Sequence, residues 1–250
     1  MRPAGNDGAA YLMAQAPVFE RQLRLLAAHG AAFARIEAAE AAHVPPAPRW
    51  RQDWFARLDA AMAYAIVAQF RPARIVEVGC GHSTRFMAQA ISDHALATQF
   101  TAIDPAPRAS LEGLQVNRHA QHLQECDIAL FTALRPGDIA FFDSSHVYAP
   151  ASDVALIFER ILPRLAPGVV VHFHDVFLPD GYPAAWAGRL YNEQQFVAGL
   201  FADGGYDALF ASHFVVTRMR AAFNASCASA LPLADGAHES SLWLRKRYQP

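Results

Sequence analysis

The residue types and spacing best suited to chemistry are two glycines and a distant acid. Gly79 and Gly81 follow a short apolar run that begins at Arg74, and Asp104 ends a second apolar run that contains Phe100. The spacing fits a strand, a crossover helix and a second strand, in which the glycines admit a ligand and the acid lies where a ribose diol binds. The pattern therefore predicts half of a site for a nucleoside-containing cofactor.

Two polar clusters follow later apolar runs. Asp-Ser-Ser-His occupies 143–146, and His-Phe-His-Asp occupies 172–175. In open α/β sheets ligands bind beyond the carboxyl ends of the strands, so these side chains should meet Asp104 at one rim. Histidine suits proton transfer because its usual pKa is about 6.5, which makes His146 and His174 candidates for a general base. Each could equally be a hydrogen-bonded histidine without a catalytic part.

The glycine turn departs from the dinucleotide fingerprint, because Thr84 stands where G-x-G-x-x-G requires its third glycine. The run Glu77-Val-Gly-Cys-Gly-His-Ser-Thr84 instead resembles the E-x-G-x-G-x-S/T motif of class I S-adenosylmethionine-dependent methyltransferases. The resemblance implies that Glu77 helps hold the ammonium group of S-adenosylmethionine and that Asp104 binds its ribose hydroxyls. The implied cofactor-binding residues are Glu77, Gly79, Gly81, Ser83, Asp104 and Asp143. A structural glycine turn in another α/β enzyme is the alternative.

The chain from about Arg74 to Lys246 is similar to a bacterial subfamily of this class, methyltransferase family 24. The similarity lies in the segments 141–148, 168–179 and 191–193. It implies methyl transfer to an oxygen, or to a nitrogen, of a small molecule, and it does not fix the acceptor. A NAD-dependent oxidoreductase and a non-catalytic S-adenosylmethionine-binding protein remain as alternatives.

A divalent cation such as Mg²⁺ is a competing use of the same rim. Some O-methyltransferases of this fold hold a cation with carboxylates after the fourth and fifth strands, and the cation lowers the pKa of the acceptor hydroxyl. Asp143 and Asp175 match those two places. The neighbouring His174 and the lack of a nearby lysine weaken this interpretation, since Mg²⁺ prefers oxygen ligands.

Aromatic residues after the fifth predicted strand suggest a lid over the acceptor. Tyr182, Trp186 and Tyr191 accompany Pro and Gly between Phe177 and Phe196. Aromatic side chains supply contact area, and Pro and Gly supply hinges. A packed surface loop followed by a helix at 189–201 is the alternative.

The order of elements predicts an α/β fold: a Rossmann-like, doubly wound, mostly parallel seven-stranded sheet with helices on both faces and an N-terminal helical extension. Residues 1–72 are expected to form a helical cap, with helices in 11–42 and 52–70, and residues 73–250 the methyltransferase domain. The predicted strands are 74–78, 98–103, 121–125, 138–142, 168–174, 206–210 and 241–246. The predicted helices are 83–92, 109–119 and 152–164, and 213–219 is ambiguous between strand and helix.

Composition excludes several classes of protein. A chain of 250 residues with 53% apolar residues and a net charge of −2 offers no electrostatic footprint for nucleic acid. Its apolar runs are too short to span a membrane, and it starts without a signal peptide, so a cytoplasmic location is expected. Three cysteines without C-x-x-C spacing indicate neither disulfides nor zinc. The N-terminal helices could support a homo-oligomer, and the expected partner is a small-molecule acceptor.

Overall fold

Short, mostly apolar runs form the strands of one central sheet in the computed structural model, which describes residues 7–40, 44–202 and 204–247. Within these residues the sheet has seven strands in the order β3-β2-β1-β4-β5-β7-β6. The first five pair in parallel, and β7 runs antiparallel to both β5 and β6. The strands are β1 (Arg74–Val78), β2 (Gln99–Ile103), β3 (Asn117–His119), β4 (Ile139–Phe142), β5 (Val170–Phe173), β6 (Tyr206–Ala211) and β7 (Leu242–Lys246). The predicted fold class is confirmed.

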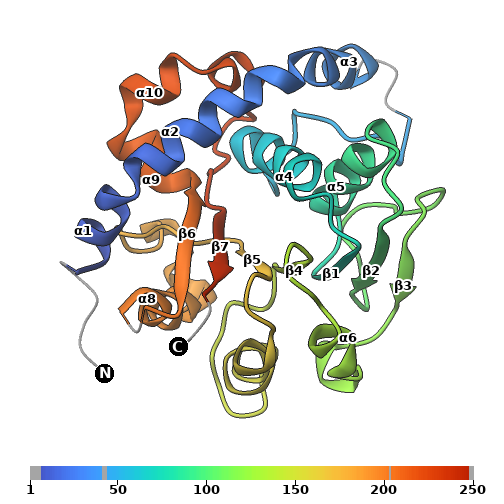
Figure 1. Cartoon of the computed structure of the whole chain (residues 1–250), viewed down its shortest axis with the longest axis vertical. Helices are drawn as coiled ribbons and strands as arrows, with labels where there is room; N and C mark the ends of the chain where they lie inside the picture. Colours follow the sequence, from blue (N-terminus) through green and yellow to red (C-terminus); the bar gives the residue numbers. More distant parts are fainter. Residues whose placement is uncertain (1–6, 41–43, 203, 248–250) are drawn as a thin grey trace.

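Helices cover both faces of the sheet, with α4 and α5 on one face and α6 on the other (Figure 1). The α-helices are α1 (Asp7–Ala14), α2 (Ala16–Leu25), α3 (Gly30–Glu40), α4 (Arg57–Phe70), α5 (His82–Asp93), α6 (Ala129–Thr132), α7 (Asp153–Leu156), α8 (Glu193–Ala202), α9 (Ser212–Arg218) and α10 (Arg220–Asn224). The 3₁₀ helices are η1 (Leu26–His29), η2 (Leu123–Glu125), η4 (Leu162–Arg164), η5 (Ala184–Arg189) and η6 (Cys227–Ala230), and η3 (Ile157–Ile161) is a π-helix. No helix of the described residues is long and apolar enough to cross a membrane.

The N-terminal helices share the core of the sheet. One cluster of buried side chains contains Leu12 and Phe19 from the N-terminal helices together with strand residues such as Ile75 and Phe210. The Phe19 and Phe210 rings meet edge to face with centroids 5.9 Å apart. Side chains of α2 and α4 pack in the same cluster as those of the strands. The expected domain boundary between residues 72 and 73 remains a prediction.

The register of the sheet brings four loops to one edge. Val78 pairs with Ile103 and with Phe142, and Phe142 pairs with Phe173. The carboxyl ends of β1, β2, β4 and β5 are therefore level, and the segments that follow them leave from the same side. This edge is where a ligand site is expected in an open α/β sheet.

Two predicted elements are wrong. The predicted helix 109–119 is irregular up to β3, and the predicted strand 121–125 contains the helical turn η2. Leu111 and Leu114 have helical spacing, but Leu111 is instead buried in a small separate cluster with Cys80 and Ala102. Gly113, with φ of 86°, interrupts any helix here. The local packing of Leu111 therefore outweighs the helix propensity of this segment.

Other boundaries differ by smaller amounts. The predicted helix 52–70 begins at Arg57, because the side-chain Oε1 of Gln52 accepts hydrogen bonds from the backbone amides of Trp54 and Phe55 and holds a turn. The predicted helix 152–164 is present as α7, η3 and η4 in succession, with the Ser152 hydroxyl accepting from the Ala155 amide at its start. The ambiguous segment 213–219 is mostly α9.

Candidate functional site

A cavity of about 730 Å³ opens at the carboxyl edge of the sheet. Its walls come from the turn after β1 and the segments after β2, β4 and β5. Three further segments contribute to it: 53–54 before α4, 121–124 after β3 and 235–238 before β7. The size is ordinary for a small-molecule site, and the walls draw on residues far apart in the sequence.

Gly79 shapes one end of this cavity. It has φ of 77°, and a Cβ at this position would lie 1.9 Å from the carbonyl oxygen of Asp143. Glycine is therefore required both by the left-handed backbone and by the close approach of the loop after β4. The absent side chain leaves the turn lining the cavity together with Cys80.

Asp104 lies in the same wall, directly after β2. One carboxylate oxygen accepts a hydrogen bond from the Cys80 amide at 2.8 Å, and the other accepts from the Ala106 amide at 2.7 Å. Each oxygen keeps a second acceptor site, so the carboxylate is held in place and can still bind two hydroxyls. This geometry fits the ribose diol implied for Asp104.

Glu77 and Ser83 lie behind the turn rather than in the cavity wall. The two Glu77 carboxyl oxygens accept hydrogen bonds from the Ser83 and Thr84 hydroxyls, both at 2.6 Å. Burial raises the pKa of Glu77 to about 8 despite these two bonds. The contacts make Glu77 a support for the start of α5, and its contact with an ammonium group stays a prediction. Gly81 also lies outside the cavity lining, at the cap of α5.

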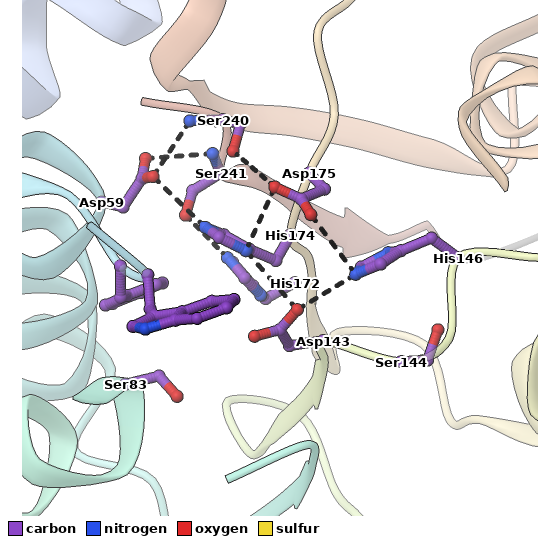
Figure 2. Close-up of polar contacts among 12 residues, drawn as sticks. Asp59, Ser83, Asp143, Ser144, His146, His172, His174, Asp175, Ser240 and Ser241 are labelled. Carbon is purple, nitrogen blue, oxygen red and sulfur yellow. Dashed lines mark hydrogen bonds and ion pairs between the residues drawn. The ribbon is translucent and has the colours of Figure 1, made fainter. Parts of the chain in front are cut away.

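At the other end of the cavity two carboxylates face two histidines (Figure 2). Nε2 of His146 lies 3.2 Å from Oδ1 of Asp143 and 3.5 Å from Oδ2 of Asp175. Nδ1 of His174 lies 3.5 Å from the same Asp143 oxygen and 3.6 Å from Oδ1 of Asp175. The structure therefore brings together all four of the rim residues that the sequence singled out.

Each of these histidines has a further carboxylate on its other ring nitrogen. Nδ1 of His146 lies 2.8 Å from Glu193, the first residue of α8. Nε2 of His174 lies 3.4 Å from Asp59 of α4, whose oxygens also accept from the backbone amides of Ser240 and Ser241. Both outer carboxylates are buried, Glu193 with 2% and Asp59 with 0% of its surface exposed.

Charge pairing shifts the ionisation of this cluster. Burial alone would lower the pKa of His146, but its bonds to Asp143 and Glu193 raise the pKa well above its usual value. Burial is likewise outweighed for His174, whose pKa is raised by Asp143 and Asp175. Burial would raise the pKa of Asp143, and the two histidines lower it instead. Both histidines are consequently favoured in the charged form.

Two members of the cluster have unusual backbone conformations. His146 has φ of 59° and Asp175 has φ of 53°. The left-handed region costs a side-chain-bearing residue about 1–3 kcal/mol and is typical of functional sites. The carbonyl of His146 accepts from the amides of Asn192 and Glu193 at 3.0 and 3.2 Å, which helps to hold its conformation.

His172 belongs to the core. It is fully buried, its ring stacks on Phe141 with centroids 3.7 Å apart, and its Nε2 lies 2.9 Å from the Ser241 hydroxyl. Burial lowers its pKa well below the usual value, with His174 adding to the effect. The neutral ring packs beneath the cluster and outside the cavity.

The predicted lid contributes two of its three aromatic residues to the cavity. Trp186 and Tyr191 line it, and the Tyr191 ring lies 4.7 Å from that of His146. Arg189 stacks its guanidinium 4.1 Å above Trp186 and also lines the cavity. The Tyr182 hydroxyl accepts from the Gln194 amide, and this residue lies outside the cavity lining.

Sequence patterns missed several residues of this site. Asp59 is one acid on a predicted helix and has no local motif. Glu193 lies in the segment 191–193 that resembles methyltransferase family 24, but the sequence assigned it no role. Trp54 and His238 line the cavity from segments remote in sequence. The acid at 193 close to the aromatic lid was the one signal that could have been noticed.

The carboxylates expected to hold a metal are occupied by histidine contacts. Among the residues that the structure describes, no three His, Cys, Asp or Glu side chains are arranged to hold a metal ion. Asp143 and Asp175 instead contact His146 and His174. This arrangement of carboxylates and histidines does not fit a resident cation. The metal site expected at Asp143 and Asp175 remains a prediction.

One protein-family model matches part of the chain. Residues 76–176, from β1 to just beyond β5, match a family model described as a methyltransferase domain, Methyltransf_24. No curated protein matches the chain.

Similar solved structures include the Podospora anserina methyltransferase PaMTH1 bound to S-adenosylhomocysteine, with 20% identity over 77% of this chain and 80% of that chain and a TM-score of 0.48. The plantazolicin methyltransferase BpumL, with a desmethyl-plantazolicin analogue and S-adenosylhomocysteine, has 12% identity over 92% and 98% and a TM-score of 0.47. CmcI with Mg and S-adenosylmethionine has 19% identity over 74% and 69% and a TM-score of 0.43. At these TM-scores the likenesses add no further argument.

Proposed function

We propose that this chain is an S-adenosylmethionine-dependent methyltransferase that methylates an oxygen of a small molecule, with His146 as the general base. The match of residues 76–176 to a methyltransferase domain model supports the reaction class. The observation that carries the proposal is one cavity with Gly79 and Asp104 at one end and His146 at the other. A nucleoside held at the first end would direct its reactive methyl group toward the second.

At the cofactor end the chain binds and orients. Bound S-adenosylmethionine supplies an activated methyl group on a sulfonium. The turn at Gly79 gives room for close approach, and Asp104 accepts hydrogen bonds from the ribose hydroxyls. Asp143 lies beside this turn and lines the cavity between its two ends. Fixing both reactants in one cavity removes much of the entropic barrier to an in-line displacement.

At the acceptor end the chain receives a proton. As the bond from the acceptor oxygen to the methyl carbon forms and the carbon–sulfur bond breaks, the hydroxyl proton passes to Nε2 of His146. The products are a methyl ether and S-adenosylhomocysteine. His146 is preferred over His174 because its ring lies against Tyr191 of the lid and its backbone is held in the left-handed conformation. A base must be neutral, so the raised pKa of His146 delays this step to higher pH.

The lid is proposed to exclude water from the transfer and to contact the acceptor. Tyr191 lies against His146, and Trp186 packs edge-on against Tyr191. Both rings line the cavity, which favours a small organic acceptor that can lie against them. Tyr182 supports this segment through its bond to the Gln194 amide. A cation held by Asp143 and Asp175 stays a hypothesis, and the proposed transfer does not require one.

The function is tested by transfer of label from methyl-labelled S-adenosylmethionine to a panel of hydroxylated and amino small molecules. Label should appear in a methyl ether, and S-adenosylhomocysteine should form in equal amount. Label found only in N-methyl products would contradict the choice of oxygen. Exhaustive treatment with EDTA should leave the rate unchanged, and a loss that Mg²⁺ restores would establish the metal site.

A further inference from the structure

A buried carboxylate outside the matched domain meets the proposed base. Glu193 is 2% exposed, and its Oε2 lies 2.8 Å from Nδ1 of His146. Its other oxygen accepts from the Ser144 hydroxyl at 3.3 Å. Burying a carboxylate is costly unless it is paired, and within the described residues both side-chain partners of the Glu193 carboxylate belong to the loop after β4.

Further contacts join that loop to the start of α8. The carbonyl of His146 accepts from two successive amides, those of Asn192 and Glu193. The Asn192 side chain accepts from the Tyr148 amide at 2.6 Å and donates to the Tyr148 carbonyl at 3.2 Å. The Tyr148 ring stacks on Phe196 with centroids 4.0 Å apart. The loop that carries His146 is thus fixed to the segment that follows the lid residue Tyr191.

The contact with Glu193 decides which nitrogen of His146 faces the reactants. With Nδ1 directed at Glu193, the ring presents Nε2 to Asp143 and Asp175. His174 has the opposite orientation, with Nε2 toward Asp59 and Nδ1 toward the same two aspartates. The hydrogen bond at one ring nitrogen sets the role of the other, so each outer carboxylate fixes one ring.

The two outer carboxylates differ in what holds them. Asp59 is anchored by the backbone amides of Ser240 and Ser241, at 2.9 and 3.0 Å. Glu193 instead begins the helix that follows Tyr191, and the Tyr191 ring itself packs on His146. One short segment, 191–193, therefore carries both the lid residue that packs on His146 and the carboxylate that orients its ring.

We propose that Glu193 is a positioning residue for methyl transfer, which holds Nδ1 of His146 so that Nε2 faces the acceptor and which links this orientation to the lid. The proposal rests on the proposed function for its kinetic consequence. Its structural part concerns the ring of His146 alone. Removing a carboxylate that orients a metal-bound histidine commonly costs about 10- to 100-fold in activity, and we expect the same range for the ring of His146.

The test compares Glu193→Gln with the wild-type chain. Gln keeps the size of the side chain, but its amide can present either oxygen or nitrogen to Nδ1, so the ring is no longer held in one state. We expect kcat to fall about 10- to 100-fold. The KM for S-adenosylmethionine and the Kd for S-adenosylhomocysteine should stay within about twofold, because the cofactor end is untouched.

Asp138→Asn is the matched control. Asp138 is also a buried carboxylate, but it lies at the amino-terminal end of β4, away from the cavity, where it accepts from the amides of Arg74 and Arg135. Its loss should lower thermal stability and leave the kcat of the folded protein unchanged. If both variants lowered kcat in proportion to their loss of stability, Glu193 would be structural only.

A spectroscopic readout separates this inference from the proposed function. In ¹⁵N-histidine NMR of the full chain, the signals of His146 are assigned by their loss in His146→Asn. The Nδ1 signal should shift in Glu193→Gln and stay unchanged in Asp138→Asn. An unchanged His146 signal in Glu193→Gln would overturn the proposal, whether or not the wild-type chain transfers methyl groups. A shifted signal in a chain without transferase activity would retain the contact and reject the kinetic role.

Discussion

The two ends of the cavity are built in different ways. The proposed cofactor end consists of one local unit, in which Gly79 and Asp104 follow neighbouring parallel strands and are fixed by backbone contacts. The acceptor end consists of side chains from α4, the loops after β4 and β5, and α8. A local unit can be recognised from spacing along the chain. A cluster assembled from remote segments is defined only by the fold, and it is also where specificity can vary without altering the cofactor site.

Substituting His146 should give the largest effect and should act on one end only. His146→Asn is expected to lower kcat by about 10²- to 10⁴-fold, the range that general bases contribute. The Kd for S-adenosylhomocysteine should change less than twofold, measured by calorimetry. His119→Asn on the outer strand β3 serves as control and should leave both constants unchanged. A comparable loss in His174→Asn with normal activity in His146→Asn would move the base to His174.

Gly79→Ala should disable the cofactor end. The added Cβ would collide with the Asp143 carbonyl in a left-handed backbone, so S-adenosylhomocysteine affinity is expected to fall at least about 100-fold, or about 2.7 kcal/mol. Gly113→Ala is the control, since Gly113 also has a positive φ but its nearest neighbour is 3.7 Å away. The control should lose about 1 kcal/mol of the free energy of unfolding and keep its affinity. Equal losses of affinity would contradict a specific role for the turn.

The pH dependence sharpens the contrast between the two ends. His146 is faced by Asp143, Asp175 and Glu193, which hold its pKa well above about 6.5. A base must be neutral, so kcat should rise about tenfold per pH unit below this raised pKa and level off above it. The Kd for S-adenosylhomocysteine should not follow the same curve. A profile of kcat already flat from pH 6 to 9 would exclude His146 as the base.

The lid should give the smallest effect. Trp186→Ala is expected to raise the acceptor KM by about three- to tenfold, because truncating a partly buried aromatic contact costs on the order of 1 kcal/mol. The cofactor KM should not change. Trp54→Ala is a useful comparison, since Trp54 lines the cavity from the N-terminal segment and stacks on Arg108. If Trp186→Ala left both KM values and kcat untouched, the lid would be an ordinary packed loop.

The same contrast explains what the sequence could predict. The mostly parallel sheet, the antiparallel edge formed by 206–211 and 242–246, and the rim containing His146 and Asp175 follow from local apolar runs and from the geometry of parallel strands. The predicted helix 109–119 is wrong because the spacing of Leu111 and Leu114 serves a tertiary contact. No local pattern assigned a role to Asp59 or to Glu193, since their contacts with His174 and His146 join segments far apart in the chain.

The central claim is that the turn after β1 and Asp104 bind a sulfonium nucleoside or its product. Calorimetry should detect S-adenosylhomocysteine binding to the wild-type chain and no binding of NAD. Asp104→Asn should weaken that binding about 10- to 100-fold, because hydrogen bonds to a charged group contribute about 1.5–3 kcal/mol. Asp127→Asn, whose carboxylate accepts from the Ala129 amide outside the cavity lining, should bind normally. Binding of NAD in place of S-adenosylhomocysteine, with the same dependence on Asp104, would contradict the assignment.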